Sequence, residues 1–263
     1  MVVPTPIYAR CSVPGPKLEV QSGVSPLASL PDLLNRDVWV IVRCFNEATV
    51  AGAVIQELTR SFPNVVGVDD GSTDGSSEVI REAGARVVRH AINLGAGAAL
   101  QTGLQFALLD PAAQYFVCFD ADGQHRVSDA IGMVERMRNE DLDILIGSRF
   151  LGSAAGMPRT RRSVLRAARV FERLSSGVSL SDAHNGLRVF TRRFASQLSF
   201  SMRDMAYASE LLRFIRQSGL RYGEHPVTVD YTVYSLAKGQ RSVNSINIAM
   251  DVWMQRIFGR RPS

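Results

Sequence analysis

Four short strand-like runs alternate with helical patterns along residues 38–120, and this alternation constrains the fold more than any other feature of the sequence. Strand–helix alternation with short turns predicts an α/β domain built on a parallel sheet with right-handed crossovers. Ser72 or Thr73 is expected to cap the second helix, because a hydroxyl there can accept a hydrogen bond from the first turn. The predicted strands are Val38–Val42, Val65–Val68, Arg86–Arg89 and Phe116–Asp120, and the predicted helices are Thr49–Ser61, one ending at Ile80, and one running from the Asn93–Gly97 turn to Leu109.

The length of 263 residues suits one large α/β domain with an accessory lobe. Residues 1–36 carry six of the 11 prolines and little periodicity, so we expect an extended or partly disordered arm. Residues 37–241 form the expected main domain. In residues 242–263, apolar side chains recur at three- and four-residue steps and arginines follow, which predicts an amphipathic helix and a basic tail.

The net charge of +5 and the pI of about 9.4 favour an anionic partner such as a nucleotide, a lipid phosphate or a membrane surface. The sequence has no RNA- or DNA-binding motif, so we expect no nucleic-acid partner. Cys11, Cys44 and Cys118 form no paired motif, which favours a reducing compartment. No apolar run has the length of a membrane span and no secretory signal is visible, and we therefore expect a cytoplasmic location.

Polar clusters follow three of the predicted strands, at Asn46–Glu47, Asp69–Asp70 and Asp120–Asp122. In an alternating sheet these strand ends converge on one edge, where open α/β sheets bind ligands. Two carboxylates one residue apart repel each other unless a cation lies between them, and Mg²⁺ or Mn²⁺ commonly binds carboxylates together with substrate phosphates. We expect Asp120 and Asp122 to hold a divalent ion that clamps a nucleotide diphosphate. A helix N-cap or an acidic turn is the alternative for this spacing.

The Asn93–Gly97 turn opens the third predicted helix with two glycines. It has part of a dinucleotide-binding fingerprint, but the third glycine is absent because residue 100 is Leu. A helix start of this kind lets a ligand approach Gly97 closely. Tight packing of the helix on the sheet explains the glycines equally well.

Seven polar segments follow one another along the chain. They are Asn46–Glu47, Asp69–Asp74, Asn93–Gly97, Asp120–His125, Gly147–Phe150, Asp182–Arg188 and Glu224–Val227. This ordered set resembles the family 2 inverting glycosyltransferases, and within them the dolichol-phosphate mannosyltransferase branch and its bacterial polyprenyl-phosphate relatives. The resemblance covers about residues 38–245 and implies a GT-A fold. That fold is a Rossmann-like, mostly parallel sheet with helices on both faces and an acceptor-side lobe in the C-terminal part.

The resemblance also implies roles for individual residues. The nucleotide sugar, linked to GDP or UDP, is expected to contact Phe45, Glu47, Asp69, Asp70, Gly97, Asp120, Ala121 and Asp122. The metal ion, Mg²⁺ or Mn²⁺, is expected at Asp120, Asp122 and Gln124. The acceptor phosphate is expected at Arg149, Arg161 and Arg162, and the catalytic residues are expected to be Asp122, Arg149, Asp182 and Glu210.

The reaction of such a site breaks the bond between sugar C1 and the diphosphate and inverts the anomeric centre. A metal and nearby arginines stabilise the negative charge on the leaving group. A lipid-phosphate acceptor is already an anion and needs no base, whereas a sugar hydroxyl needs a carboxylate to take its proton. Asp182 and Glu210 are the candidates for that base, and Glu210 equally fits a solvated helix face or an ion pair with Arg213.

Two departures from the family pattern stand out. Arg43 occupies a position where relatives usually carry proline, and Lys238–Ser242 replaces a Gly-x-Ser-Lys segment.

Two basic segments have alternative interpretations. On a helix predicted to end at Leu174, a stripe of arginines almost without acidic partners forms either a solvated face or a contact for anionic headgroups. The C-terminal helix either packs on its own domain or a second subunit, or lies in the membrane interface. The stripe consists of Arg162, Arg166, Arg169 and Arg173.

We therefore expect a metal-dependent inverting glycosyltransferase that moves a hexose from a nucleotide sugar to a polyprenyl phosphate of the dolichol type. It is expected to bind peripherally at the inner face of the membrane, and a homo-oligomeric state is left open. The alternatives are transfer to a saccharide hydroxyl during surface polysaccharide assembly, and a sugar-nucleotide-binding scaffold without turnover.

Overall fold

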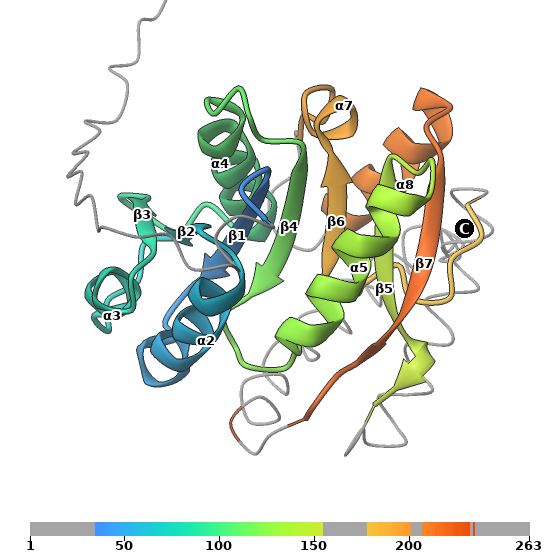
Figure 1. Ribbon diagram of the computed structural model, residues 1–263. Coiled ribbons are helices and arrows are strands. Elements are labelled where there is room, and N and C mark those ends of the chain that lie inside the picture. Colours follow the sequence, from blue (N-terminus) through green and yellow to red (C-terminus); the bar gives the residue numbers. More distant parts are fainter. Residues whose placement is uncertain (1–34, 155–177, 201–206, 232–233, 235–263) are drawn as a thin grey trace, which may run out of the picture.

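The computed structural model describes residues 35–154, 178–200, 207–231 and 234. These residues form one seven-stranded sheet in the order β3-β2-β1-β4-β6-β5-β7, with α2 and α5 against the near face in Figure 1. The strands are β1 (Val38–Cys44), β2 (Asn64–Asp69), β3 (Arg86–Arg89), β4 (Tyr115–Asp120), β5 (Ile144–Ser153), β6 (Arg188–Thr191) and β7 (Tyr222–Thr228). The helices are α2 (Ala48–Ser61), α3 (Ser76–Glu82), α4 (Ala96–Leu108), α5 (Val127–Asn139), α7 (Arg192–Ala195) and α8 (Tyr207–Ser218).

The sheet is mostly parallel, as the strand–helix alternation predicts. β3, β2, β1 and β4 pair in parallel, and β7 pairs in parallel with β5. β6 runs antiparallel to both of its neighbours, β4 and β5, so β5 points the same way as β1 and β4. The carboxyl ends of β1, β2, β4 and β5 and the start of β6 therefore meet at one edge of the sheet.

The central strand β1 explains why the sheet is covered on both faces. Val38, Val40 and Val42 point into the core under α2 and α5, while Trp39 and Ile41 point into the core under α4 and α8. A parallel strand buried on both faces is apolar at nearly every position, which is the pattern of this run. Burying each such side chain contributes roughly 1.5–3 kcal/mol, so the two cores fix the position of the strand ends.

The helix α4 packs unusually close to β1 because its middle carries a glycine. A Cβ on Gly103 would collide with the side chain of Ile41 and lie 3.1 Å from Cγ2 of Val68. The close packing holds the first turn of α4, and with it Gly97, against the carboxyl edge of the sheet.

The predicted cap of α3 is wrong. The helix begins at Ser76, after Gly75 in the left-handed region at φ +86°. The Ser72 hydroxyl instead accepts a hydrogen bond from the Asn46 amide at 2.9 Å, and Asp74 accepts one from the Ser76 amide at 3.1 Å. Ser72 thus ties the loop after β2 to the loop after β1, and Asp74 rather than Ser72 or Thr73 contacts the first residue of α3.

Several predicted segments lie outside the described residues. They are nearly all of the N-terminal arm, the arginine stripe of residues 162–173 and the C-terminal helix of residues 242–258. None of the helices that the structure describes combines the length and apolar character needed to cross a membrane.

Candidate active site

The two carboxylates of the Asp-x-Asp motif lie on one tight turn at the carboxyl edge of the sheet. β4 ends at Asp120, and the Ala121 amide donates to the carbonyl of Arg43 on β1 at 3.2 Å. Gly123 adopts φ +72°, and the Gln124 amide donates to Oδ1 of Asp122 at 3.1 Å. The backbone therefore carries Asp120 and Asp122 on one turn at the carboxyl end of β4.

Asp120 faces a positive environment. Its Oδ1 forms an ion pair with Nη2 of Arg43, and Nε2 of His125 lies 3.8 Å from its Oδ2. Burial raises the pKa of Asp120, but the charge of Arg43 and its hydrogen bond to Asp120, together with the charge of Arg188, outweigh burial and lower that pKa below its ordinary value. Asp120 is therefore ionised at neutral pH.

His125 is a neutral side chain in this site. Burial lowers its pKa to about 4, and the opposing attraction of Asp120 is weaker than burial. Its Nδ1 has no hydrogen-bond partner among the described residues. Its ring packs edge-on to Phe119, with the ring centres 5.8 Å apart. His125 therefore lines the site as a neutral side chain and does not act as an acid.

Asp69 and Asp70 are buried and organise the surrounding loops. Asp69 accepts a hydrogen bond from the Ser72 amide at 2.9 Å and pairs with the Ser77 hydroxyl. Asp70 accepts from the amides of Leu94 at 2.9 Å and Gly95 at 2.8 Å, just before α4, and pairs with His90. The structure brings both residues to the carboxyl edge, as predicted, with carboxylates that hold the loops after β2 and before α4 together.

The loop after β1 places an exposed aromatic ring beside a buried carboxylate. Phe45 is 39% exposed, Asn46 adopts φ +52°, and Glu47 is buried at the start of α2. Oε2 of Glu47 accepts a hydrogen bond from the Tyr234 hydroxyl at 2.6 Å. An exposed ring next to buried polar groups is an arrangement that can receive a nucleoside.

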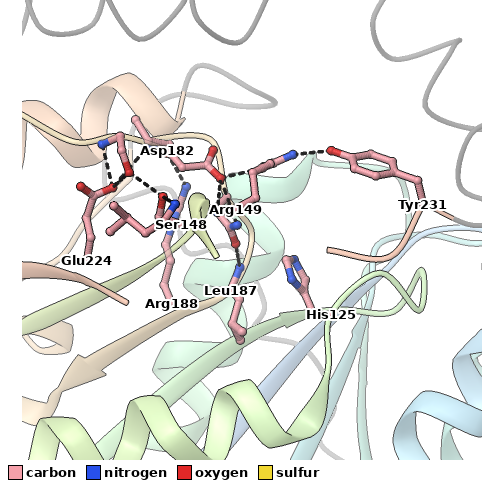
Figure 2. Close-up of polar contacts among 12 residues, drawn as sticks. His125, Ser148, Arg149, Asp182, Leu187, Arg188, Glu224 and Tyr231 are labelled. Carbon is pink, nitrogen blue, oxygen red and sulfur yellow. Dashed lines mark hydrogen bonds and ion pairs between the residues drawn. The ribbon is translucent and has the colours of Figure 1, made fainter. Parts of the chain in front are cut away.

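Arg149 is held between two partners above the sheet edge (Figure 2). Its Nε donates to Oδ2 of Asp182 at 2.6 Å and its Nη1 donates to the Tyr231 hydroxyl at 2.8 Å. Burial lowers the pKa of Arg149, but Asp182 and Tyr231 outweigh burial and raise it. Oδ2 of Asp182 also accepts from the Arg149 amide at 3.1 Å and from Asn185 at 3.2 Å, so this carboxylate is committed to Arg149 and its own loop.

Glu224 on β7 fixes the loop that carries Asp182. Its Oε1 accepts from the amide and hydroxyl of Ser181, both at 2.7 Å, and from the Asp182 amide at 3.1 Å. Figure 2 shows Asp182 between Glu224 and Arg149. The position of this loop is therefore fixed by its hydrogen bonds to β7.

Glu210 lies on α8, one turn after Tyr207, and is half-buried. The Tyr207 hydroxyl accepts a hydrogen bond from Nη1 of Arg43 at 2.5 Å, which brings the first turn of α8 to the carboxylate edge. Arg161 and Arg162 lie outside the described residues, so their predicted contact with the acceptor stays a prediction.

The carboxylates of the Asp120–Asp122 turn fit a divalent ion whose remaining ligands come from the substrate. Hard cations bind one or two carboxylates together with phosphate oxygens. Among the described residues, no group of three or more His, Cys, Asp or Glu side chains could hold a metal. One oxygen of Asp120 is engaged by Arg43, and Asp122 is half-buried on the same turn. The turn alone supplies few ligands, and a diphosphate would supply the others.

Three tyrosines and one arginine that shape the site were not predicted from the sequence. Tyr207, Tyr231 and Tyr234 hold Arg43, Arg149 and Glu47 through their hydroxyls, across 82 to 187 residues of chain. Arg188 is fully buried at the start of β6. Arg188 belongs to the Asp182–Arg188 segment of the family resemblance. The tyrosines cannot be recognised from the residues around them, because their partners are distant in sequence.

Comparisons with known proteins agree with this geometry. The family model described as glycosyl transferase family 2 matches residues 39–199. The chain is 33% identical over 231 residues to an uncharacterized protein of Methanocaldococcus jannaschii, covering 86% of this chain and 95% of that protein. It is 28% identical to the UDP-N-acetylglucosamine–dolichyl-phosphate N-acetylglucosaminyltransferase of Methanococcus voltae, covering 77% and 89%. It is 25% identical to the undecaprenyl-phosphate mannosyltransferase of Micrococcus luteus, covering 78% and 80%.

Solved structures share the fold. A glucosyl-3-phosphoglycerate synthase of Mycobacterium tuberculosis, in complex with Mn²⁺ and UDP-glucose, has a TM-score of 0.57 at 18% identity, covering 81% of this chain and 78% of that one. The seven-stranded α/β sheet with its carboxylate edge is therefore the GT-A fold predicted from the motifs. The chain belongs to glycosyl transferase family 2 and is a glycosyltransferase.

Proposed function

We propose that this glycosyltransferase moves a hexose from a nucleotide sugar, with inversion, to a polyprenyl phosphate. The observation that carries the choice of acceptor is the commitment of Asp182 to Arg149. That carboxylate is 3% exposed and accepts hydrogen bonds from Arg149 and Asn185, so it is poorly suited to take a proton from a sugar hydroxyl. An acceptor that is already an anion needs no such base.

The relatives support the same acceptor. The proteins of Methanococcus voltae and Micrococcus luteus differ in the sugar that their names give, yet both names specify a lipid phosphate. The similarity to these relatives therefore supports a lipid-phosphate acceptor for the present chain, but it does not indicate which sugar is transferred.

The reaction requires little proton movement. An oxygen of the acceptor phosphate attacks C1 of the sugar from the face opposite the diphosphate. The C1–O bond then breaks, its electron pair leaves with the nucleoside diphosphate, and the anomeric centre inverts. Arg149, fixed by Asp182 and Tyr231, presents a guanidinium for phosphate oxygens without having to reorganise during the reaction.

The donor end of the site is proposed at the carboxyl edge of β1, β2 and β4. Phe45 and Glu47 would receive the nucleoside, with Asp69 and Asp70 shaping the surrounding loops, and Gly97 and Ala121 would allow close approach of the diphosphate. A divalent ion at the Asp120–Asp122 turn, near Gln124, would neutralise charge developing on the leaving diphosphate. The complex of the Mycobacterium tuberculosis enzyme with Mn²⁺ and UDP-glucose supports this assignment.

The place of action is proposed to be the inner face of the membrane, where a soluble donor can meet a lipid acceptor. The net charge of +5 favours attraction to anionic lipids. The arginine stripe of residues 162–173 is the proposed contact with these lipids, and Arg161 and Arg162 are the proposed contacts with the acceptor phosphate.

Glu210 supports a second candidate acceptor, a saccharide hydroxyl. This half-buried carboxylate lies on the turn of α8 that reaches the site through Tyr207, and it would be the base if a saccharide hydroxyl were the acceptor.

Donor binding is tested by thermal unfolding with a panel of UDP- and GDP-linked hexoses, each with Mn²⁺ or with EDTA. A ligand at 100 times its Kd adds about 2.7 kcal/mol to the unfolding free energy. We expect one nucleotide class to raise the melting temperature with Mn²⁺ and to raise it less with EDTA. Equal shifts in both buffers would contradict metal dependence, and no shift with any nucleotide would contradict the donor class.

A further inference from the structure

Arg43 is a charged side chain at the carboxylate edge to which the proposed reaction gives no role. It stands where the family resemblance led us to expect proline. In the structure its side chain is 9% exposed, its Nη2 pairs with Asp120, and its Nη1 donates to the Tyr207 hydroxyl. Its guanidinium carbon also lies 5.4 Å from the centre of the Tyr207 ring. A buried cation with this set of partners is held in one place.

The backbone enforces the contact between Arg43 and Asp120. The two residues are register partners on the neighbouring parallel strands β1 and β4, so their side chains emerge on the same face. Gly186, in the loop before β6, closes over the pair. A Cβ at that position would collide with Oδ2 of Asp120 and lie 3.3 Å from Nη2 of Arg43. Asp120 therefore has little freedom to turn away from Arg43.

A second guanidinium adds to the positive field beneath Asp120. Arg188 pairs in register with Cys118 on β4, two residues before Asp120, and lies 5.2 Å from the centre of the same Tyr207 ring. It donates to the Ala183 carbonyl at 3.1 Å, whereas its Nε and Nη1 have no hydrogen-bond partner among the described residues. Positive charge so close to a cation site opposes the binding of a free metal ion.

We propose that Arg43 is a positioning residue that neutralises Asp120 and fixes its orientation, so that a divalent ion enters the site together with the donor's phosphates rather than before them. This inference rests on the proposed function, because it presumes that the Asp120–Asp122 turn meets a metal and a nucleotide diphosphate. It gives the arginine a definite effect: the donor-free protein binds metal weakly because Arg43 already balances one of the two carboxylates.

The test measures the affinity of the donor-free protein for Mn²⁺ by calorimetry in four forms: wild type, Arg43→Met, Asp120→Asn and the double variant. An opposite charge in contact with a carboxylate changes its proton affinity by about tenfold or more, and we expect a similar factor for Mn²⁺. Arg43→Met should bind Mn²⁺ about tenfold more tightly, and Asp120→Asn about tenfold more weakly, because that variant leaves Arg43 unpaired. The double variant should return to within about threefold of wild type.

Two outcomes overturn the inference. If the double variant binds Mn²⁺ as weakly as Asp120→Asn, Asp120 is a direct ligand that Arg43 does not balance. If Arg43→Met gains no affinity, Arg43 does not oppose the metal. The double variant also guards against misfolding of either single variant, because removing both partners of a buried pair is often neutral for stability.

A charge control and an orientation control complete the design. Arg126→Met removes the same formal charge from an exposed ion pair with Asp230, and it should change Mn²⁺ affinity by less than about twofold. Tyr207→Phe keeps the charge of Arg43 but removes its hydrogen-bond partner. It should leave Mn²⁺ affinity unchanged and lower kcat about threefold or more at saturating donor. An unchanged kcat in Tyr207→Phe would contradict the orienting role.

The same titrations separate this inference from the proposed function. If wild type and all variants fail to bind Mn²⁺ even with UDP or GDP present, the metal-dependent function is wrong and the inference falls with it. If wild type binds Mn²⁺ only with a nucleotide diphosphate and Arg43→Met also binds it alone, both hold. If wild type binds Mn²⁺ equally well with and without nucleotide, only the role of Arg43 is wrong.

Discussion

The ion pair between Arg149 and Asp182 leads to a quantitative prediction for the variant Asp182→Asn. Both side chains are nearly inaccessible, at 7% and 2% exposed, and Oδ2 of Asp182 accepts three hydrogen bonds. Removing one partner of a buried pair leaves the other charge uncompensated, which typically destabilises by about 3–5 kcal/mol. We therefore expect Asp182→Asn to lower the free energy of unfolding by about 3–5 kcal/mol at pH 7.

Urea unfolding followed by circular dichroism measures this change, and a double-mutant cycle with Arg149→Met isolates the pair. Residues in direct contact couple by about 0.5–3 kcal/mol, so the double variant should lose clearly less stability than the sum of the single variants. A general base without a structural role would instead lose activity at unchanged stability. Asp182→Asn with the stability of wild type, or strict additivity in the cycle, would refute the role of Asp182 as the partner that positions Arg149.

Three further predictions follow from the site. Asp122→Ala should reduce transfer to below about 1% of wild type while the circular dichroism spectrum stays the same, because it removes an oxygen ligand and no core volume; full activity in that variant would contradict the metal site. With polyprenyl phosphate as acceptor, Glu210→Gln should keep its rate within about tenfold of wild type, whereas a loss of about 10²-fold would indicate a hydroxyl acceptor. The pKa of His125 is about 4 in the folded protein and about 6.5 in the unfolded chain, so its contribution to stability is complete above pH 6.5 and is lost, by up to about 3 kcal/mol, as the pH falls to 4. His125→Gln should flatten the dependence of unfolding free energy on pH in that window, and an unchanged slope would show that His125 is not the group responsible.

The parallel half of the sheet was predictable because its strands carry their own signal. β1 and β4 are apolar runs buried on both faces, and each ends in polar residues that mark the carboxyl edge. Once alternation fixes the direction of these strands, the convergence of Glu47, Asp69 and Asp120 follows from topology. The family motifs add Arg149 and Asp182, although the sequence does not reveal that the two form an ion pair.

The reversed strand and the tyrosine contacts were not predictable for a physical reason. β6 is only four residues long and begins with the buried Arg188, so it lacks the apolar pattern of a central strand. The pairs of Arg43 with Tyr207 and of Arg149 with Tyr231 join residues 164 and 82 positions apart. Such pairs depend on how distant elements pack, so the helix and strand preferences of neighbouring residues do not predict them. The predicted cap of α3 was wrong because the Ser72 hydroxyl accepts a hydrogen bond from the Asn46 amide instead.

The central claim is transfer to a lipid phosphate, and one transfer assay tests it most directly. The purified protein is incubated with Mn²⁺, a polyprenyl phosphate and UDP- or GDP-linked hexoses labelled in the sugar. The account predicts that the label from at least one donor moves into the organic phase as a polyprenyl phosphohexose, with an anomeric configuration opposite to that of the donor, and that EDTA prevents the transfer. Label that reaches only a saccharide hydroxyl, or a lipid product with retained configuration, would contradict it.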